Sequence, residues 1–147
     1  MLTHLKILKA PKSTPKEIIF LELGLLPLRE VIKQRRMNFL YYLIHQKSDS
    51  MIKRVFEMQN KNRTPKDWIT TVLKDTEELE LNVTFEEIKR MSKEGWKSMV
   101  KSSIKDKTFQ TLEAIKQNHS KVRKLKHEYL ELQSYFKPNK QVCSKET

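Results

Sequence analysis

Hydrophobic residues recur at three- and four-residue steps along most of this chain, which is the period of amphipathic helices. The clearest example is the segment LGLLPLREVIKQRRMNFLYYLIHQ, residues 23–46. Gly24 can adopt the left-handed conformation that ends a helix, and Pro27 suits the start of the next one. We therefore expect a helix from about Leu28 to Gln46. Its predicted apolar stripe consists of Leu28, Ile32, Phe39 and Leu43, with Val31, Leu40 and Ile44 beside them.

Two adjacent arginines, Arg35 and Arg36, interrupt this stripe. An unpaired charge inside an apolar interface is too costly to keep. Each arginine must therefore pair with an acid, extend to the surface, or contact an anion such as phosphate. The sequence leaves these alternatives open, although Asp75 and Glu78 in the acidic middle of the chain are available as structural partners.

Further helix starts are marked by capping residues. Thr64 followed by Pro65 predicts a helix that runs to about Leu79, with Thr64 as its cap. Thr84 and Glu87 have the spacing of a capping box. Shorter signals predict a helix from about residue 15 to Gly24, one after Ser50, and a long one from about residue 96 to 118 that either breaks at Gly95 or includes it.

The composition supports an all-α fold. The chain has 147 residues, of which 37% are hydrophobic and only two are glycine. This length suits one domain with a core, and the scarcity of glycine disfavours numerous β-turns. We predict a compact bundle of about six amphipathic helices with a basic C-terminal segment. The expected organisation is a flexible lead-in over residues 1–13, a helical domain over 14–136 and a disordered tail over 137–147.

The charge indicates the class of partner. A formal net charge of +12 makes a polyanion the leading candidate. The charge is uneven, because residues 1–63 and 96–147 are basic whereas residues 64–95 are net acidic. The acidic middle can either neutralise the basic helices or leave them free for a ligand.

Two groups of cations are candidate nucleic-acid-binding residues. The first comprises Lys33, Arg35, Arg36, Lys53 and Arg54, and the second comprises Lys121, Arg123, Lys124 and Lys126. The second group lies in HSKVRKLKH, residues 119–127, which contains no acid. Such groups would hold RNA or single-stranded DNA through phosphate contacts without reading its sequence.

Aromatic residues can stack on nucleobases, but most are expected in the core here. Trp68 and Trp96 stand beside aliphatic residues at helical spacing, so we expect both to be buried. Tyr41 and Tyr135 stay open between stacking and packing.

Catalytic, cofactor and metal sites are not expected. The sequence has no Gly-rich phosphate loop, nucleophile elbow or His-Glu-x-x-His motif. Surface charge accounts for Asp75 and Glu78 better than acid/base chemistry does. His119, His127 and Cys143 have no spacing that fits a compact metal site. No apolar run is long enough to cross a membrane, and the N-terminus does not resemble a signal peptide, so we expect an intracellular protein, nuclear or cytoplasmic.

Three blocks of sequence carry a resemblance to a known family. In order they are LELGLLPLREVIKQRRMNFLYYLIHQ, PKDWITTVLKD and SKVRKLKHEYLELQSYFKPN. Together they resemble the region that follows the polymerase domain in reverse transcriptases of non-LTR, LINE-type retrotransposons. The catalytic Tyr-x-Asp-Asp motif of the polymerase is absent, so the resemblance implies a detached fragment without polymerase activity.

The sequence thus favours a non-catalytic module that binds nucleic acid electrostatically. One alternative is a helical protein-interaction module that docks on a reverse transcriptase domain, for which exposed apolar surface would be the sign. Another is a decayed element fragment without function.

Overall fold

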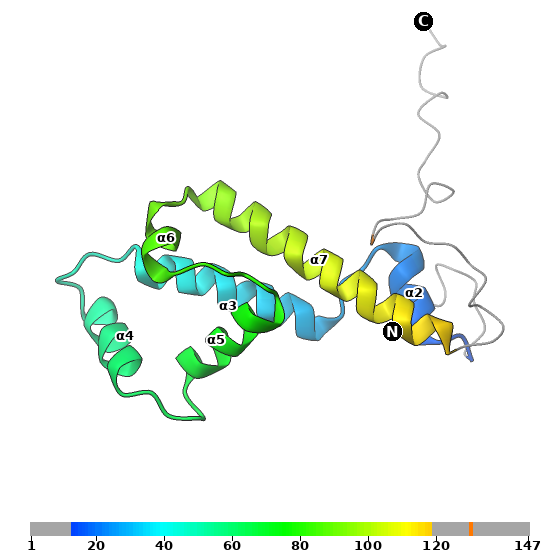
Figure 1. Ribbon diagram of the computed structural model, residues 1–147, viewed down its shortest axis with the longest axis horizontal. Coiled ribbons are helices and arrows are strands. Elements are labelled where there is room, and N and C mark those ends of the chain that lie inside the picture. Colours follow the sequence, from blue (N-terminus) through cyan, green and yellow to red (C-terminus); the bar gives the residue numbers. More distant parts are fainter. Residues whose placement is uncertain (1–12, 119–129, 131–147) are drawn as a thin grey trace, which may run out of the picture. The chain divides into compact units, whose positions relative to one another are not determined.

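The computed structural model describes residues 13–118 and Leu130, and these residues form six helices and no strand (Figure 1). The all-α prediction is therefore confirmed for this part of the chain, and none of its helices is long and apolar enough to cross a membrane. The helices are α2 (Lys16–Leu23), α3 (Leu28–Ile44), α4 (Met51–Lys61), α5 (Trp68–Glu78), α6 (Phe85–Arg90) and α7 (Lys93–Gln117).

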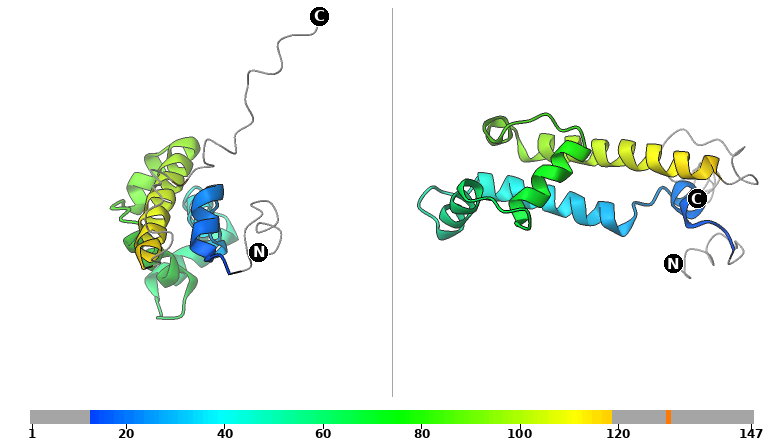
Figure 2. Two further views of the ribbon diagram at one scale, coloured as in Figure 1. Left: turned by 90° about the vertical axis from the view of Figure 1, so that its right-hand side faces the viewer. Right: turned by 60° about the horizontal axis from the view of Figure 1, so that its bottom comes forward.

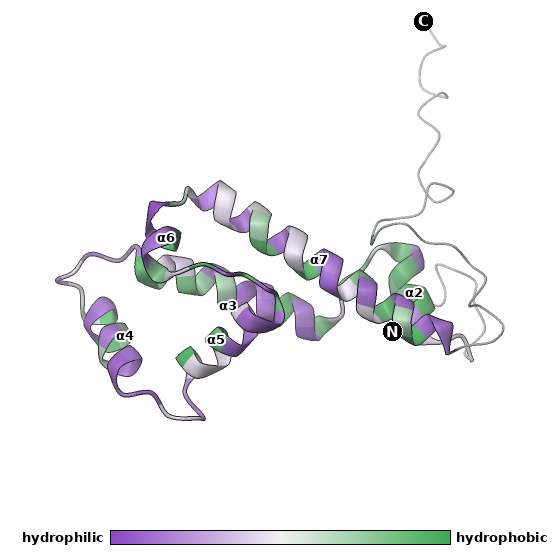
Figure 3. Cartoon of the chain, viewed as in Figure 1, coloured by the Kyte–Doolittle hydropathy of each residue, from purple (hydrophilic) through white to green (hydrophobic). Residues whose placement is uncertain are grey.

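The chain divides into two compact units, residues 27–107 and residues 1–26 with 108–147. In the second of these, Leu21 of α2 is buried together with Leu112 of α7 and Leu130. Helix α2 is mostly apolar (Figure 3) and ends at Gly24, which has a φ of 60°. Only glycine adopts this left-handed conformation without steric cost, so the predicted helix stop at Gly24 is confirmed.

Helix α3 is central to the unit of residues 27–107, because α4, α5 and α6 all contact it. The first turns of α7 also lie alongside it (Figure 2). Trp96 of α7 is fully buried, and its indole N–H donates a hydrogen bond of 3.1 Å to the carbonyl oxygen of Met37. The burial predicted for Trp96 is confirmed. The core around this contact contains Met37, Leu40, Ile44, Ile69, Val72, Ile88, Val100 and Ile104.

Only part of the predicted apolar stripe of α3 is buried. Leu40, Leu43 and Ile44 are buried as predicted. The buried residues are Lys33, Met37, Leu40, Leu43 and Ile44. Leu28 and Phe39, which were predicted to be internal, are 73% and 48% exposed, and Ile32 is exposed as well. Helix α3 has two apolar faces, and periodicity within one helix does not determine which of them the neighbouring helices cover. An apolar row therefore remains on the surface.

Two of the predicted helix caps are present. The Ser50 side chain accepts a hydrogen bond from the Lys53 backbone N–H at the start of α4. At α6, the Thr84 hydroxyl accepts from the Glu87 N–H, and the Glu87 carboxylate accepts from the Thr84 N–H at 2.7 Å. This reciprocal pair is the predicted capping box.

The predicted start of α5 is wrong. The helix begins at Trp68 instead of Pro65, and Asp67 occupies the cap position. The Asp67 carboxylate accepts a hydrogen bond of 2.7 Å from the Thr64 N–H, and the Asp67 N–H donates to the Thr64 carbonyl. These bonds close a turn over residues 64–67, so the helix begins only after this turn. Gly95, in contrast, is included within α7.

Thr84→Ala should lower the free energy of unfolding by on the order of 1 kcal/mol, because the Glu87 N–H loses its acceptor. Chemical denaturation followed by circular dichroism measures the change. Thr84→Ser keeps the hydroxyl and should remain close to the parent protein. An unchanged midpoint for Thr84→Ala would show that this cap contributes nothing to stability.

Candidate nucleic-acid interface

Two of the predicted nucleic-acid-binding cations, Lys33 and Arg36, are engaged in ion pairs between α3 and α5. The Lys33 ammonium lies 2.8 Å from the Glu78 carboxylate and 3.2 Å from that of Glu30. The Arg36 guanidinium lies 2.6 Å from the carboxylate of Asp75, which is buried. Lys33 itself is only 5% exposed. Of the three alternatives for Arg36, the structure therefore shows pairing with an acid of the same chain. Lys33 is not a surface cation.

The remaining members of the first predicted group are one engaged lysine, Lys53, and two exposed arginines, Arg35 and Arg54. The Lys53 ammonium donates a hydrogen bond of 2.9 Å to the Ile44 carbonyl and lies over the Phe56 ring. It therefore neutralises the negative C-terminal end of α3. Arg35 and Arg54 are exposed, and within the described residues neither forms an ion pair. Within the first predicted group, only Arg35 and Arg54 therefore stay predicted phosphate contacts.

The ion pairs shift the protonation of both Lys33 and Glu78. Burial by itself lowers the pKa of Lys33, but the hydrogen bond and charge of Glu78, together with Glu30, outweigh burial and raise this pKa. The hydrogen bond from Lys33 holds the pKa of Glu78 below its ordinary value. Both groups are therefore charged around neutral pH, as the ion pair requires.

A row of lysines on α7 supplies the exposed cations that the first predicted group lacks. Lys93, Lys97, Lys101 and Lys105 follow one another at four-residue steps, so they form one ridge on the helix. The first three are exposed and Lys105 is half-buried. Lys101 and Lys105 have no acid three or four residues away on the helix. The Lys-x-x-x-Lys spacing is visible in the sequence, but it becomes a surface feature only once α7 is known to include residue 93.

A hollow of about 210 Å³ adjoins the beginning of this row. Its walls come from the end of α3 and the start of α7, and they combine aromatic, amide and cationic side chains. The lining residues are Asn38, Tyr41, Tyr42, His45, Gln46, Lys93, Trp96 and Lys97. Tyr42 is 47% exposed and stacks on Phe39 with ring centroids 5.8 Å apart.

Tyr41 is held in a fixed position in this hollow. Its hydroxyl donates a hydrogen bond of 3.0 Å to the Met91 carbonyl, and its ring stacks on that of His45 with centroids 3.9 Å apart. Tyr41 was left open between stacking on a nucleobase and packing within the fold. Because its hydroxyl has a structural partner, packing is favoured. Tyr42, with its half-exposed ring, is the better stacking platform.

The other candidate acids and aromatic residues have structural roles or lie outside the described residues. Asp75 and Glu78 are ion-paired, and Trp68 is half-buried where full burial was expected. Across residues 13–118, no cluster of three His, Cys, Asp or Glu side chains could hold a metal ion. The second predicted group, Lys121, Arg123, Lys124 and Lys126, lies outside the described residues, as do His119, His127, Tyr135 and Cys143.

Comparison of the chain with protein-family models, with curated proteins and with solved structures finds no match.

Arg36→Ala should lower the free energy of unfolding by on the order of 3 kcal/mol, because it leaves the Asp75 carboxylate buried without its partner. The neighbouring substitution Arg35→Ala is the matched control. It removes the same side chain from an exposed position and should change stability by less than about 0.5 kcal/mol. Urea denaturation of both variants measures the difference. Equal effects would contradict a structural role for Arg36.

The Lys33–Glu78 pair predicts an acid-sensitive part of the stability. Because the folded-state pKa of Glu78 is depressed, its contribution is present above the ordinary carboxyl pKa and is lost as pH falls through the folded value. Glu78→Gln should therefore destabilise the protein at pH 7 by less than about 1 kcal/mol, since this carboxylate is half exposed.

Denaturation of the parent protein and Glu78→Gln at several pH values tests this prediction. The two unfolding free energies should converge below about pH 4. A difference that stays constant from pH 7 down to pH 3 would show that the Glu78 charge contributes nothing.

Proposed function

We propose that this protein is a non-catalytic module that binds single-stranded nucleic acid, RNA or DNA, along the lysine row of α7. The observation that carries the proposal is the continuity of this row, Lys93, Lys97, Lys101 and Lys105, with the aromatic hollow beside Tyr42. Phosphates would lie along the lysines, and a base would enter the hollow.

The energetics of the row favour a polyanionic ligand. Lysines four residues apart repel one another, and each like-charge pair destabilises a helix by about 0.2–0.5 kcal/mol. The row contains three such pairs in succession and extends over roughly 18 Å at 1.5 Å per residue. A phosphate backbone laid along it would relieve the repulsion and release condensed counterions.

The hollow supports a single strand in preference to a duplex. Bases in a single strand are free to stack on aromatic side chains, whereas those in a duplex are already stacked. The exposed ring of Tyr42 offers a face, and Lys93 and Lys97 in the same wall place positive charge next to it. The contact would be tolerant of sequence, because every base has a π-face.

We add to this proposal the other cations that the sequence predicts as phosphate contacts. Arg35 and Arg54 are exposed, and the segment with Lys121, Arg123, Lys124 and Lys126 adds four more positive charges. We also retain as a proposal that the module derives from the region after the polymerase domain of a non-LTR reverse transcriptase. In that setting it would hold the nucleic acid on which a polymerase acts, in the nucleus or cytoplasm.

Changing Lys93, Lys97, Lys101 and Lys105 together to Gln should weaken binding to labelled oligo(U) and oligo(dT). Each lost phosphate contact reduces the slope of log affinity against log salt by about 0.7 on a single strand, so the slope should flatten by up to about 3 units. Fluorescence anisotropy over a range of salt concentrations measures the slope, and a duplex of equal length tests the preference for single strands.

A control variant removes the same charge elsewhere. Lys47, Lys61, Lys66 and Lys74 are all exposed, and changing these four to Gln should flatten the slope much less. In a third variant, Lys121, Arg123, Lys124 and Lys126 are changed to Gln. It measures how much the 119–127 segment contributes to the salt dependence of binding. Equal slopes in the first variant and its control, or no binding at low salt, would overturn the assignment to α7.

A further inference from the structure

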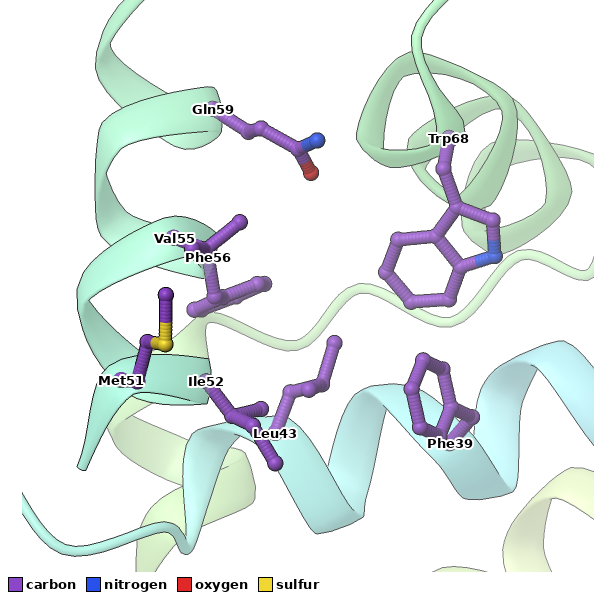
Figure 4. Close-up of a pocket in the computed structure, with 8 residues that line it drawn as sticks. All are labelled: Phe39, Leu43, Met51, Ile52, Val55, Phe56, Gln59 and Trp68. Carbon is purple, nitrogen blue, oxygen red and sulfur yellow. The ribbon is translucent and has the colours of Figure 1, made fainter.

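An apolar groove lies over α3, between α4 and α5, and has a volume of about 380 Å³ (Figure 4). Phe39 and Leu43 of α3 form its floor, and Trp68 at the start of α5 stands opposite the α4 wall. The edge of Trp68 packs against Phe39 with ring centroids 5.4 Å apart. The α4 wall consists of Met51, Ile52, Val55, Phe56 and Gln59, so Gln59 is the one polar residue in the lining.

Helix α4 leaves most of its apolar surface exposed along this groove. Phe56 is its only buried residue, whereas Met51 is 80% exposed and Ile52 and Val55 are exposed as well. These residues recur at helical spacing and form one stripe. On α3, Leu28 and Ile32 add exposed apolar surface on the other side of Arg35. Exposed apolar surface grouped along one groove is typical of an interaction site.

The surroundings of the groove are basic. Residues 35–68, which include both α4 and the groove floor, contain eight Lys or Arg and three Asp or Glu. Arg35 stands on α3 one turn before Phe39, and Arg54 directly precedes Val55 in α4, and both are exposed. The carboxylate of one of the three acids, Asp67, accepts a hydrogen bond from the Thr64 N–H. A ligand for this groove therefore needs an apolar surface bordered by negative charge.

We propose that the groove binds an amphipathic helix of a partner protein, with apolar anchors in the groove and acidic side chains that face Arg35 and Arg54. Charge complementarity selects this occupant over a second copy of the chain, because two copies would bring the same basic surface against itself. A nucleic acid strand is disfavoured, because the lining is apolar and offers no cation. This proposal is independent of the lysine row on α7.

A helix suits the groove better than an extended peptide. The described residues contain no strand, so they offer no free sheet edge to which a peptide could add. On α3, the exposed residues Leu28, Ile32 and Phe39 and the groove residue Leu43 extend along the helix axis for roughly 22 Å, about four helical turns. A partner helix with anchors at positions i, i+3 or i+4, and i+7 fits such a surface. Met51, with its flexible thioether, adapts to anchors of different shape.

The test uses the full chain and a labelled peptide of about four helical turns, with Leu and Phe on one face and Glu beside them. One control peptide carries Lys in place of Glu, and another has the same composition in scrambled order. Anisotropy titrations should show that the acidic amphipathic peptide binds at least about tenfold more tightly than either control.

The protein variants separate the groove from general charge. Ile52→Gln with Val55→Gln should weaken binding of the acidic peptide by about tenfold or more, since central apolar contacts dominate such interfaces. Met58→Gln, an exposed position on the same helix outside the groove lining, is the matched control and should bind within about threefold. The α7 lysine variant should also keep peptide binding. Arg35→Glu with Arg54→Glu should reverse the preference toward the Lys peptide.

Several outcomes would overturn the proposal. Equal binding of the scrambled peptide would show electrostatic attraction alone, and equal binding of the Lys peptide would remove the acidic preference. Light scattering that shows a dimer broken by Ile52→Gln with Val55→Gln would assign the groove to a second copy. Adsorption to vesicles of anionic lipid that depends on the same two residues would assign it to a membrane surface.

Discussion

The Arg36–Asp75 ion pair is the constraint on which the arrangement of residues 27–107 depends. Asp75 is buried, and a buried carboxylate is tolerated only beside a partner that keeps it charged and hydrogen-bonded. Together with Lys33–Glu78, it fixes α5 against one side of α3. Because this side is also the one that carries Met37 and Leu40 into the core, the apolar row from Leu28 to Phe39 is left on the surface. The core and the exposed groove are therefore two consequences of the same helix orientation.

Local signals in the sequence predicted local structure well. The stop at Gly24 and the caps at Ser50 and Thr84 are decided within about four residues, so they could be found without the fold. The start of α5 could not, because the Asp67 carboxylate competes for the Thr64 N–H and holds residues 64–67 in a turn. The exposure of Leu28, Ile32 and Phe39 on α3 could not be predicted either. The side of α3 that faces α5 is held by ion pairs to Asp75 and Glu78, which are about forty residues away in the sequence.

The sequence leads to the proposed class of partner but not to the positions of the exposed cations. Net charge indicates a polyanionic partner, yet charge alone cannot distinguish Arg35, which is exposed, from Arg36 next to it, which is paired. The four-residue spacing of the α7 lysines is visible in the sequence, but only the structure shows that Lys93 belongs to the same helix. The result is a division of surfaces, with the basic row and aromatic hollow proposed for nucleic acid and the groove over α3 proposed for a protein helix.

The most direct measurement of this division is a titration of the isotope-labelled protein with oligo(U), followed by amide chemical shifts in two-dimensional NMR. Our account predicts that, within residues 27–107, the largest shifts cluster in Lys93–Lys105 and around Tyr42. The amides of Asp75 and Glu78, which pair with Arg36 and Lys33, and those of Ile52 and Val55 in the groove lining should change little. Shifts centred on Asp75 and Glu78 or on the groove lining, or shifts spread evenly over all basic segments, would contradict it.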